Sequence, residues 1–302
     1  MKKRVLITGA TGFIGRHTLK PLIERGFEVH AVFHGLPLQM DSVTWHQSDL
    51  LKDGSAEALC SAVRATHLLH FAWIATPGEF WTSPENERWK NATIDLMRTF
   101  KKSGGSRAII AGTCAEYDWT VAKETLPERA PLKPATLYGK AKNDTRIALE
   151  GFAEESGLSL GWGRIFFLYG PHEPPSKFVA YIVNELLAGR KALLSPCEQI
   201  RDFLYAADVG EAFSAFLDSP VSGAVNIASG KPVALKEIAL EIGQQLGKEK
   251  FLSFGAREAS PSEPLNLVAN VGRLNEELGW TPRTTISEGL EQTIAWWRGN
   301  RA

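Results

Sequence analysis

The sequence predicts an α/β fold in which a doubly wound parallel sheet is followed by a smaller C-terminal α/β domain. Three observations support this prediction. Short β-rich runs alternate with helical patterns through the first half of the chain, a glycine-rich turn follows the first run, and the pattern becomes irregular after the proline-rich loop His172–Pro175. Strands separated by helices of this length form right-handed crossovers, and such crossovers produce a parallel sheet.

The alternation is regular enough to assign each element of the first half. The expected strands are Arg4–Thr8, Phe27–Phe33, Val43–Gln47, Thr66–Ala72, Arg107–Ala111 and Leu158–Leu168. The expected helices are Phe13–Arg25, Ala56–Arg64, Pro84–Lys102 and Thr136–Ser156. The uninterrupted apolar run Val5–Ile7 suits a strand whose sheet carries helices on both faces.

The second half is less regular. Its expected elements are a helix at Phe178–Ala188, strands near Arg201–Leu204 and Ala224–Ile227, and helices near Leu235–Leu246 and Ile286–Trp297. We therefore expect a first domain over residues 1–166, to which the chain returns near 203–228, and a second domain formed mainly by residues 167–302.

The charge balance excludes several classes of partner. The chain has 34 basic and 34 acidic side chains among 302 residues, so it lacks the basic excess that nucleic acid or an anionic membrane would require. The apolar run after Met1–Arg4 is too short for a signal peptide, and no run approaches the roughly 18 residues of a membrane span. Three cysteines without metal-type spacing favour neither disulfides nor a metal site. We expect a cytoplasmic protein.

The turn after the first strand has the glycine spacing of a phosphate cradle. It reads Gly9-Ala10-Thr11-Gly12-Phe13-Ile14-Gly15 and leads into a helix. Gly9 permits the tight turn, Gly12 lets backbone N–H groups approach a pyrophosphate, and Gly15 lets the helix pack closely on the strand. An ordinary βα turn could also contain these glycines, but here the turn opens a series of βα units. The sequence therefore predicts a Rossmann-type domain that binds a dinucleotide through Gly9, Thr11, Gly12, Phe13, Ile14 and Gly15.

Three side chains further along form a candidate catalytic group. Tyr138 and Lys142 are four residues apart, on one face of a predicted helix, and Thr113 closes the preceding strand. An ammonium beside a phenol lowers the pKa of the phenol, and the threonine hydroxyl can orient a substrate oxygen. The Tyr-Lys pair alone is common on exposed helices, but its position after the glycine loop and Thr113 favours catalysis.

These motifs resemble the extended short-chain dehydrogenases/reductases, and most closely the NAD-dependent epimerase/dehydratase family of nucleotide-sugar enzymes. The resemblance covers nearly the whole chain. Besides the glycine loop and the Thr, Tyr, Lys order, it is carried by Tyr169-Gly170-Pro171, Arg201-Asp202-Phe203 and Asn226-Ile227-Ala228-Ser229-Gly230. The resemblance implies an NAD(P)-dependent enzyme that acts on a nucleotide-linked sugar, with Tyr138 as acid/base.

The resemblance also implies roles for individual residues. Asn91 would support Lys142 through water, although a solvated helix Asn is an equal alternative. Phe71 and Ala72 would line the cofactor, as would Asp49 and Leu50 near the adenine, where Asp49 could equally be a turn residue. Arg201 would clamp the nucleotide diphosphate, and its alternative is an ion pair with Asp202 or Asp208.

Three departures from the family pattern bear on the substrate. Phe167 replaces an expected Asn, and Ser260–Glu263 lacks a second phosphate arginine, which Arg257 or Lys177 would have to replace. Where 4,6-dehydratases carry an acidic pair, this chain has Cys114-Ala115, with Glu116 out of register.

The missing acidic pair favours reduction of a 4-keto-6-deoxyhexose over dehydration. The alternatives are a nucleotide-sugar 4-epimerase, a reductase of a non-nucleotide ketone, and a dinucleotide sensor without redox activity.

Two further interpretations concern the surroundings of the site. The aromatic segment Trp73–Trp81 is expected to cap the active site, with Trp73 contacting substrate; internal packing or a contact in a homodimer is the alternative. The second strand ends Val32-Phe33-His34-Gly35, without the carboxylate that accepts the ribose 2′-OH of NAD. His34 and Arg16 could face a 2′-phosphate, so NADP is preferred over NAD.

Overall fold

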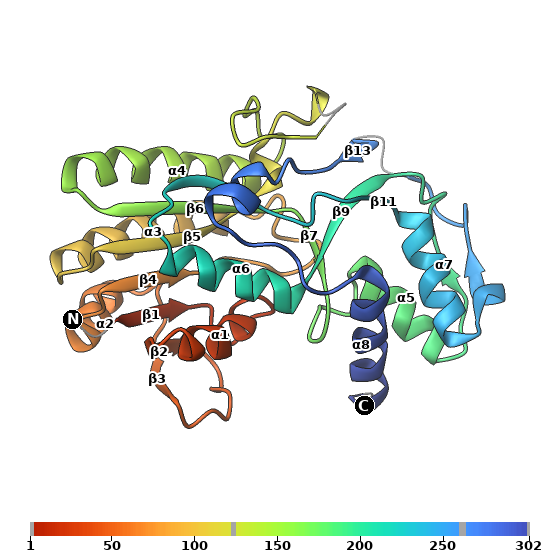
Figure 1. The fold of residues 1–302 in the computed structure, drawn as a ribbon, viewed down its shortest axis with the longest axis horizontal. Helices are drawn as coiled ribbons and strands as arrows, with labels where there is room; N and C mark the ends of the chain where they lie inside the picture. Colours follow the sequence, from red (N-terminus) through yellow and green to blue (C-terminus); the bar gives the residue numbers. More distant parts are fainter. Residues whose placement is uncertain (1–2, 122–124, 260–263, 301–302) are drawn as a thin grey trace.

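A seven-stranded parallel sheet forms the centre of the computed structural model, which describes residues 3–121, 125–259 and 264–300 (Figure 1). Its strands are β1 (Arg4–Thr8), β2 (Glu28–Phe33), β3 (Val43–Gln47), β4 (His67–His70), β5 (Arg107–Thr113), β6 (Ser159–Ile165) and β10 (Gly223–Ile227). The spatial order is β10-β6-β5-β4-β1-β2-β3. The order reverses between β1 and β4, the point at which open α/β sheets bind ligands. The predicted doubly wound fold is confirmed.

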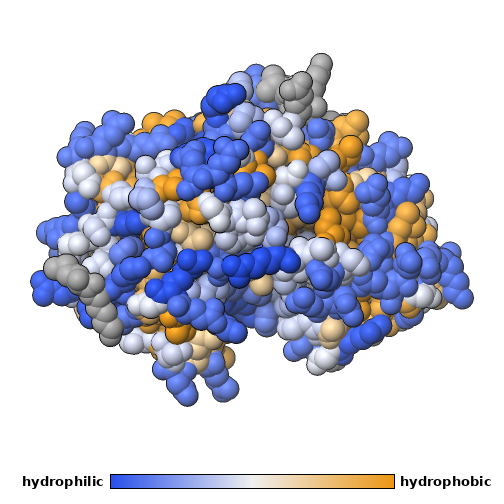
Figure 2. All heavy atoms as spheres, in the orientation of Figure 1, coloured by the Kyte–Doolittle hydropathy of each residue, from blue (hydrophilic) through white to orange (hydrophobic). Residues whose placement is uncertain are grey.

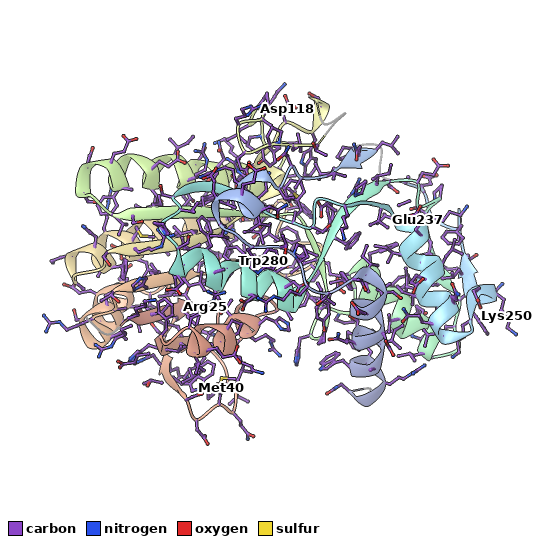
Figure 3. The ribbon with its side chains drawn as sticks, in the orientation of Figure 1. Arg25, Met40, Asp118, Glu237, Lys250 and Trp280 are labelled. Carbon is purple, nitrogen blue, oxygen red and sulfur yellow. The ribbon has the colours of Figure 1, made fainter. Side chains whose placement is uncertain are left out.

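Helices cover both faces of this sheet because successive strand residues point to opposite sides. Leu6 packs with α2 (Ser55–Val63), α3 (Glu85–Lys102) and α4 (Leu137–Ser156). Its neighbours Val5 and Ile7 pack with α1 (Leu19–Glu24) and α6 (Ala206–Asp218) on the other face. Arg25, labelled in Figure 3, ties the end of α1 to Glu211 of α6 through an ion pair of 2.6 Å.

The first helix begins later than predicted. The expected helix Phe13–Arg25 is a 3₁₀ turn, η1 (Gly15–Thr18), followed by α1. Pro21 accounts for the late start, since proline has no amide proton to donate to the preceding turn and is tolerated only in the first turn of an α-helix. Pro21 is the third residue of α1.

The chain leaves the large sheet at Phe166. The expected strand Leu158–Leu168 is two strands: β6 ends at Ile165, and β7 (Phe167–Tyr169) pairs with β9 (Ile200–Tyr205) in a second sheet. Phe166 between them donates its amide to the carbonyl of Ile227 (3.3 Å). The sequence showed one apolar run because β6 is almost entirely buried and the residues of β7 are buried or half-buried.

The second sheet and its helices form the other part of the molecule. β11 (Pro232–Ala234) and β13 (Asn266–Leu267) flank β9, while β8 (Ala192–Leu193) pairs with β12 (Leu252–Ser253). The helices α5 (Phe178–Leu187), α7 (Leu235–Leu246) and α8 (Ile286–Gly299) lie together at the end of the molecule opposite α2 and α3 (Figure 1). A separate apolar cluster, which includes Val179, Phe203 and Ile238, joins these helices to β9.

Hydrophilic side chains cover most of the face shown in Figure 2, with hydrophobic ones in scattered patches. Among the described residues, no helix is both long and apolar enough to span a membrane. The same part of the chain contains no cluster of His, Cys, Asp and Glu side chains that could hold a metal ion. The three cysteines are buried free thiols.

Candidate active site

The glycine loop lies between β1 and η1 and is shaped by close backbone contacts. Gly9 adopts a φ of +69°, and a Cβ on Gly15 would lie 2.2 Å from the carbonyl oxygen of Gly9. The Gly12 amide closes the turn on the same oxygen (3.0 Å). These contacts leave no room for side chains where a pyrophosphate would approach the backbone, so the loop fits a dinucleotide.

The end of β4 lies against this loop. A Cβ on Gly9 would lie 2.8 Å from the amide nitrogen of Ala72, which donates to the Thr8 hydroxyl (3.4 Å). The same hydroxyl bonds to His70 Nδ1 (2.7 Å). Burial, followed by the nearby charge of Lys142, lowers the pKa of His70 to about 3, so this imidazole is neutral. The structure thus brings Phe71 and Ala72 to the glycine loop.

The glycine loop provides a first testable prediction. Gly15→Ala should weaken dinucleotide binding at least about tenfold and lower the melting temperature, because its Cβ has no space beside a backbone oxygen. Gly151→Ala is the control, since the structure has nothing within 4 Å of the added methyl group and alanine favours a helix. Titration of cofactor fluorescence and a thermal melt measure both effects. Normal cofactor affinity in Gly15→Ala would contradict the assigned cradle.

The three candidate catalytic side chains meet where β5 ends and α4 begins. Tyr138 hydrogen-bonds to the hydroxyl of Thr113, and Lys142 Nζ donates to the carbonyl of Ala111 (2.9 Å). Close packing makes this possible: a Cβ on Gly139 would lie 2.3 Å from the carbonyl oxygen of Ala115. The predicted Thr, Tyr, Lys group is therefore assembled in space.

The electrostatic environment of these groups favours a protonated phenol. Burial raises the pKa of Tyr138, and the hydrogen bond with Thr113 only partly opposes this effect. Burial also lowers the pKa of Lys142 to about 7, while the charge of Glu116 raises it. Tyr138 can thus donate a proton at neutral pH, and Lys142 can change charge near neutrality.

Glu116 is fully buried in a bonded network. Its carboxylate accepts the Thr113 amide (2.9 Å) and the Trp162 indole N–H (2.9 Å), and it pairs with Arg164 (2.8 Å). The network holds the end of β5 in place and leaves Glu116 committed to these partners. Burial raises the pKa of the neighbouring Cys114 thiol to about 12, which makes this cysteine a wall residue rather than a nucleophile.

The aromatic segment predicted to cap the site lies against Tyr138. The rings of Phe80 and Trp81 meet the Tyr138 ring edge to face, with centroids 5.0 and 5.7 Å away. Lys177 lies 4.9 Å from the centroid of the Phe80 ring. Trp73, for which substrate contact stays a prediction, lies under Lys142, with 3.9 Å between Nζ and the ring centroid.

Arg201 is buried on β9 and lies near Cys114, the residue that follows Thr113. Its guanidinium is 5.2 Å from the Phe167 ring and donates to the carbonyl of Ile200 (2.9 Å), and its charge acts on the Cys114 thiol. Asp202 accepts the amides of Ser229 (2.7 Å), Gly230 (2.9 Å) and Ala269 (3.2 Å).

Asp208 in turn accepts the amides of Arg283 and Thr284. Both aspartates thus anchor backbone segments. The segment Ser260–Glu263, which lacks the second phosphate arginine, lies outside the described residues. Arg257, one of the two expected replacements, donates to the Tyr181 hydroxyl (3.1 Å).

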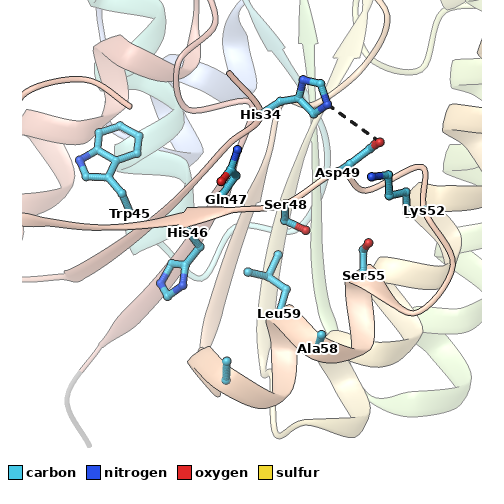
Figure 4. A pocket seen from close by; sticks show the side chains of 11 residues that line it. His34, Trp45, His46, Gln47, Ser48, Asp49, Lys52, Ser55, Ala58 and Leu59 are labelled. Carbon is cyan, nitrogen blue, oxygen red and sulfur yellow. Dashed lines mark ion pairs between the residues drawn. The ribbon is translucent and has the colours of Figure 1, made fainter. Parts of the chain in front are cut away.

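The predicted adenine side opens into a pocket of about 710 Å³ between β3 and α2 (Figure 4). His34 and Asp49 face each other across 3.9 Å, and Lys52 lines the same pocket. Asp49 also accepts a hydrogen bond from the amide of Leu51 (3.0 Å). This bond is typical of a turn residue, the alternative that the sequence left open for Asp49. Leu50 is buried. Arg16 donates to the carbonyls of Thr11 (2.7 Å) and Gly12 (3.2 Å) and so folds back over the glycine loop.

Asn91 does not join the site. It is exposed on α3, whose buried face is formed by Asn86, Thr93, Leu96, Met97 and Phe100. Five residues beyond Asn86 is nearly half a turn away from the buried side of α3, so support of Lys142 by Asn91 through water stays a prediction. Asn86, which the sequence analysis missed, shares the helical spacing of the apolar residues that mark this face.

Comparison with known proteins agrees with this geometry. Residues 5–228 match the model of the NAD dependent epimerase/dehydratase family. The chain is similar to UDP-glucuronic acid decarboxylase 1 of Xenopus tropicalis (26% identical, covering 98% of this chain and 72% of the relative) and to the UDP-glucose 4-epimerase of Schizosaccharomyces pombe (26%, 97% and 93%). Its structure is similar to that of the UDP-glucose 4-epimerase of Thermus thermophilus in complex with NAD (TM-score 0.88, 25% identical, covering 99% of this chain and 100% of the other).

Proposed function

Since the chain belongs to the NAD-dependent epimerase/dehydratase family, we propose that it is an NAD(P)-dependent oxidoreductase that reduces the 4-keto group of a nucleotide-linked 6-deoxyhexose. The observation that carries the proposal is the Thr113–Tyr138 hydrogen bond beside a buried lysine, next to a dinucleotide cradle. The names of its relatives, which include UDP-sugar enzymes, support the nucleotide-sugar class.

Each side chain has one task in this reaction. The glycine loop Gly9–Gly15 would hold the dinucleotide, which when bound would supply the hydride. Thr113 orients the keto oxygen, and Tyr138 donates its phenolic proton to that oxygen. The charged Lys142 stabilises the phenolate that remains on Tyr138. Phe80 and Trp81 shield this proton transfer from water, since their rings contact Tyr138 directly.

Two features argue against dehydration. A dehydratase needs an acid and a base beside the catalytic threonine, and Cys114 and Ala115 can supply neither at neutral pH. Glu116 cannot replace them because its carboxylate is bonded to Thr113, Trp162 and Arg164.

A 4-epimerase is the second candidate, favoured by the relatives of that name. The two reactions are distinguished by supplying a nucleotide-linked 4-keto-6-deoxyhexose with reductant, and a nucleotide-hexose without it. Consumption of the reduced cofactor in the first assay supports the reductase. Interconversion in the second assay, without net redox change, would contradict the reductase and establish the epimerase.

We further propose that NADPH is preferred over NADH. Phe33 and His34 end β2 without a carboxylate, and the adjoining pocket contains Lys52 as a cation for a 2′-phosphate. Asp49 lies in the same pocket, and its carboxylate accepts the amide of Leu51 (3.0 Å).

One charge-assisted contact to that phosphate predicts a kcat/KM about tenfold higher with NADPH than with NADH. Lys52→Gln should reduce this ratio by acting on NADPH alone. Measuring kcat/KM for both cofactors in both proteins tests the proposal, and a preference for NADH would overturn it.

A further inference from the structure

The ammonium of Lys142 rests on the face of the Trp73 indole. Its Nζ lies 3.9 Å from the ring centroid, and the side chain is only 3% exposed. The carbonyl of Ala111 accepts one of its protons (2.9 Å). A carbonyl oxygen and an aromatic face both attract a positive charge, and a desolvated cation–π contact is stronger than an exposed one.

The Trp73 ring is held in this orientation from α3. Its Nε1 donates to Oδ1 of Asn86 (2.8 Å), a fully buried residue. The amide nitrogen of Asn86 donates in turn to the carbonyls of Phe80 (2.7 Å) and Ser83 (2.8 Å). Turning the indole away from Lys142 would leave a buried amide oxygen without this donor, which is unfavourable.

The other groups facing Lys142 give it little charge compensation. His70 of β4 is neutral, and Tyr138, which lies on α4 as Lys142 does, is protonated. Glu116 attracts the ammonium, but its carboxylate is paired with Arg164. The indole face is therefore a substantial part of what favours the charged lysine over the neutral one.

We propose that Trp73 is a positioning residue that keeps Lys142 protonated and fixed beside the Thr113–Tyr138 pair. The catalytic meaning of this inference rests on the proposed function, because a charged Lys142 is what stabilises phenolate on Tyr138. The effect of Trp73 on the pKa of Lys142 can be measured without any turnover of substrate.

The test measures the pKa of Lys142 directly in the full-length protein labelled with ¹³C at lysine Cε, with Lys142→Arg identifying the resonance. Trp73→Leu should lower this pKa by about 0.5–1.5 pH units, because it removes the aromatic face. Trp73→Phe retains a ring face and should recover at least half of the shift. Trp296→Leu, which alters a half-buried tryptophan of α8, should leave the pKa unchanged.

An unshifted pKa in folded Trp73→Leu overturns the inference, as does a Trp73→Phe protein that behaves like Trp73→Leu. Under the proposed function, the alkaline limb of the kcat profile should move to lower pH by the same amount. If the pKa shifts but no keto-sugar is turned over, the proposed function fails and the role of Trp73 stands.

Discussion

Replacing Tyr138 by phenylalanine should lower kcat about 10²–10⁴-fold and leave cofactor affinity nearly unchanged. The substitution removes only the proton that the phenol donates. Its ring keeps the edge contacts with Phe80 and Trp81, and the one side-chain bond lost is that with Thr113. Steady-state turnover of a nucleotide-linked 4-keto-6-deoxyhexose and a fluorescence titration of the cofactor measure the two quantities.

Tyr181→Phe is the matched control, since it also removes a phenolic hydroxyl, one that contacts Leu193 and Arg257 in the second part of the molecule. Its turnover should equal that of the unaltered protein. Turnover of Tyr138→Phe within a few-fold of normal would remove Tyr138 from the mechanism. A large loss of melting temperature would instead mean that the hydroxyl is structural.

The fold was predictable because local and global patterns agree. The short β-rich and apolar runs predicted the strands of the large sheet, and the spacing of Gly9, Gly12 and Gly15 identified the first turn. The errors occurred where a single residue changes the local geometry. Pro21 delays the first helix, and the chain passes between sheets at Phe166 inside one apolar run.

The site was only partly predictable. Thr113, Tyr138 and Lys142 follow from their order and spacing, because four residues on a helix return to the same face. The pairing of Glu116 with Arg164 could not be predicted, since it joins residues 48 positions apart. The contact of Trp73 with Lys142 likewise depends on how a loop folds over α4, and loop geometry is weakly encoded in local sequence.

Arg201 gives the largest expected effect on substrate binding. We propose that its guanidinium anchors the nucleotide diphosphate, because it is a buried cation beside the wall formed by Phe167 and Cys114. Arg201→Ala should raise KM for the nucleotide sugar and abolish thermal stabilisation by free nucleoside diphosphates. Because the substitution removes a desolvated charge pair between Arg201 and the diphosphate, binding should be weaker by roughly 2–5 kcal/mol.

One further variant separates charge from packing at this position, and a second variant elsewhere is the control. Arg201→Met keeps an unbranched apolar stem against the Phe167 ring and removes the charge together with the guanidinium hydrogen bonds to the carbonyls of Ile200 and Leu265. It should therefore lose nucleoside diphosphate binding as fully as Arg201→Ala while retaining more stability. Arg190→Ala removes an arginine that pairs with Glu185 on the surface, and should bind normally. Thermal melts across a panel of nucleoside diphosphates distinguish the variants. Undiminished stabilisation of Arg201→Met by every nucleotide would show that the guanidinium serves the fold, and the diphosphate anchor would then have to be sought at Lys177, the cation that lies over the Phe80 ring.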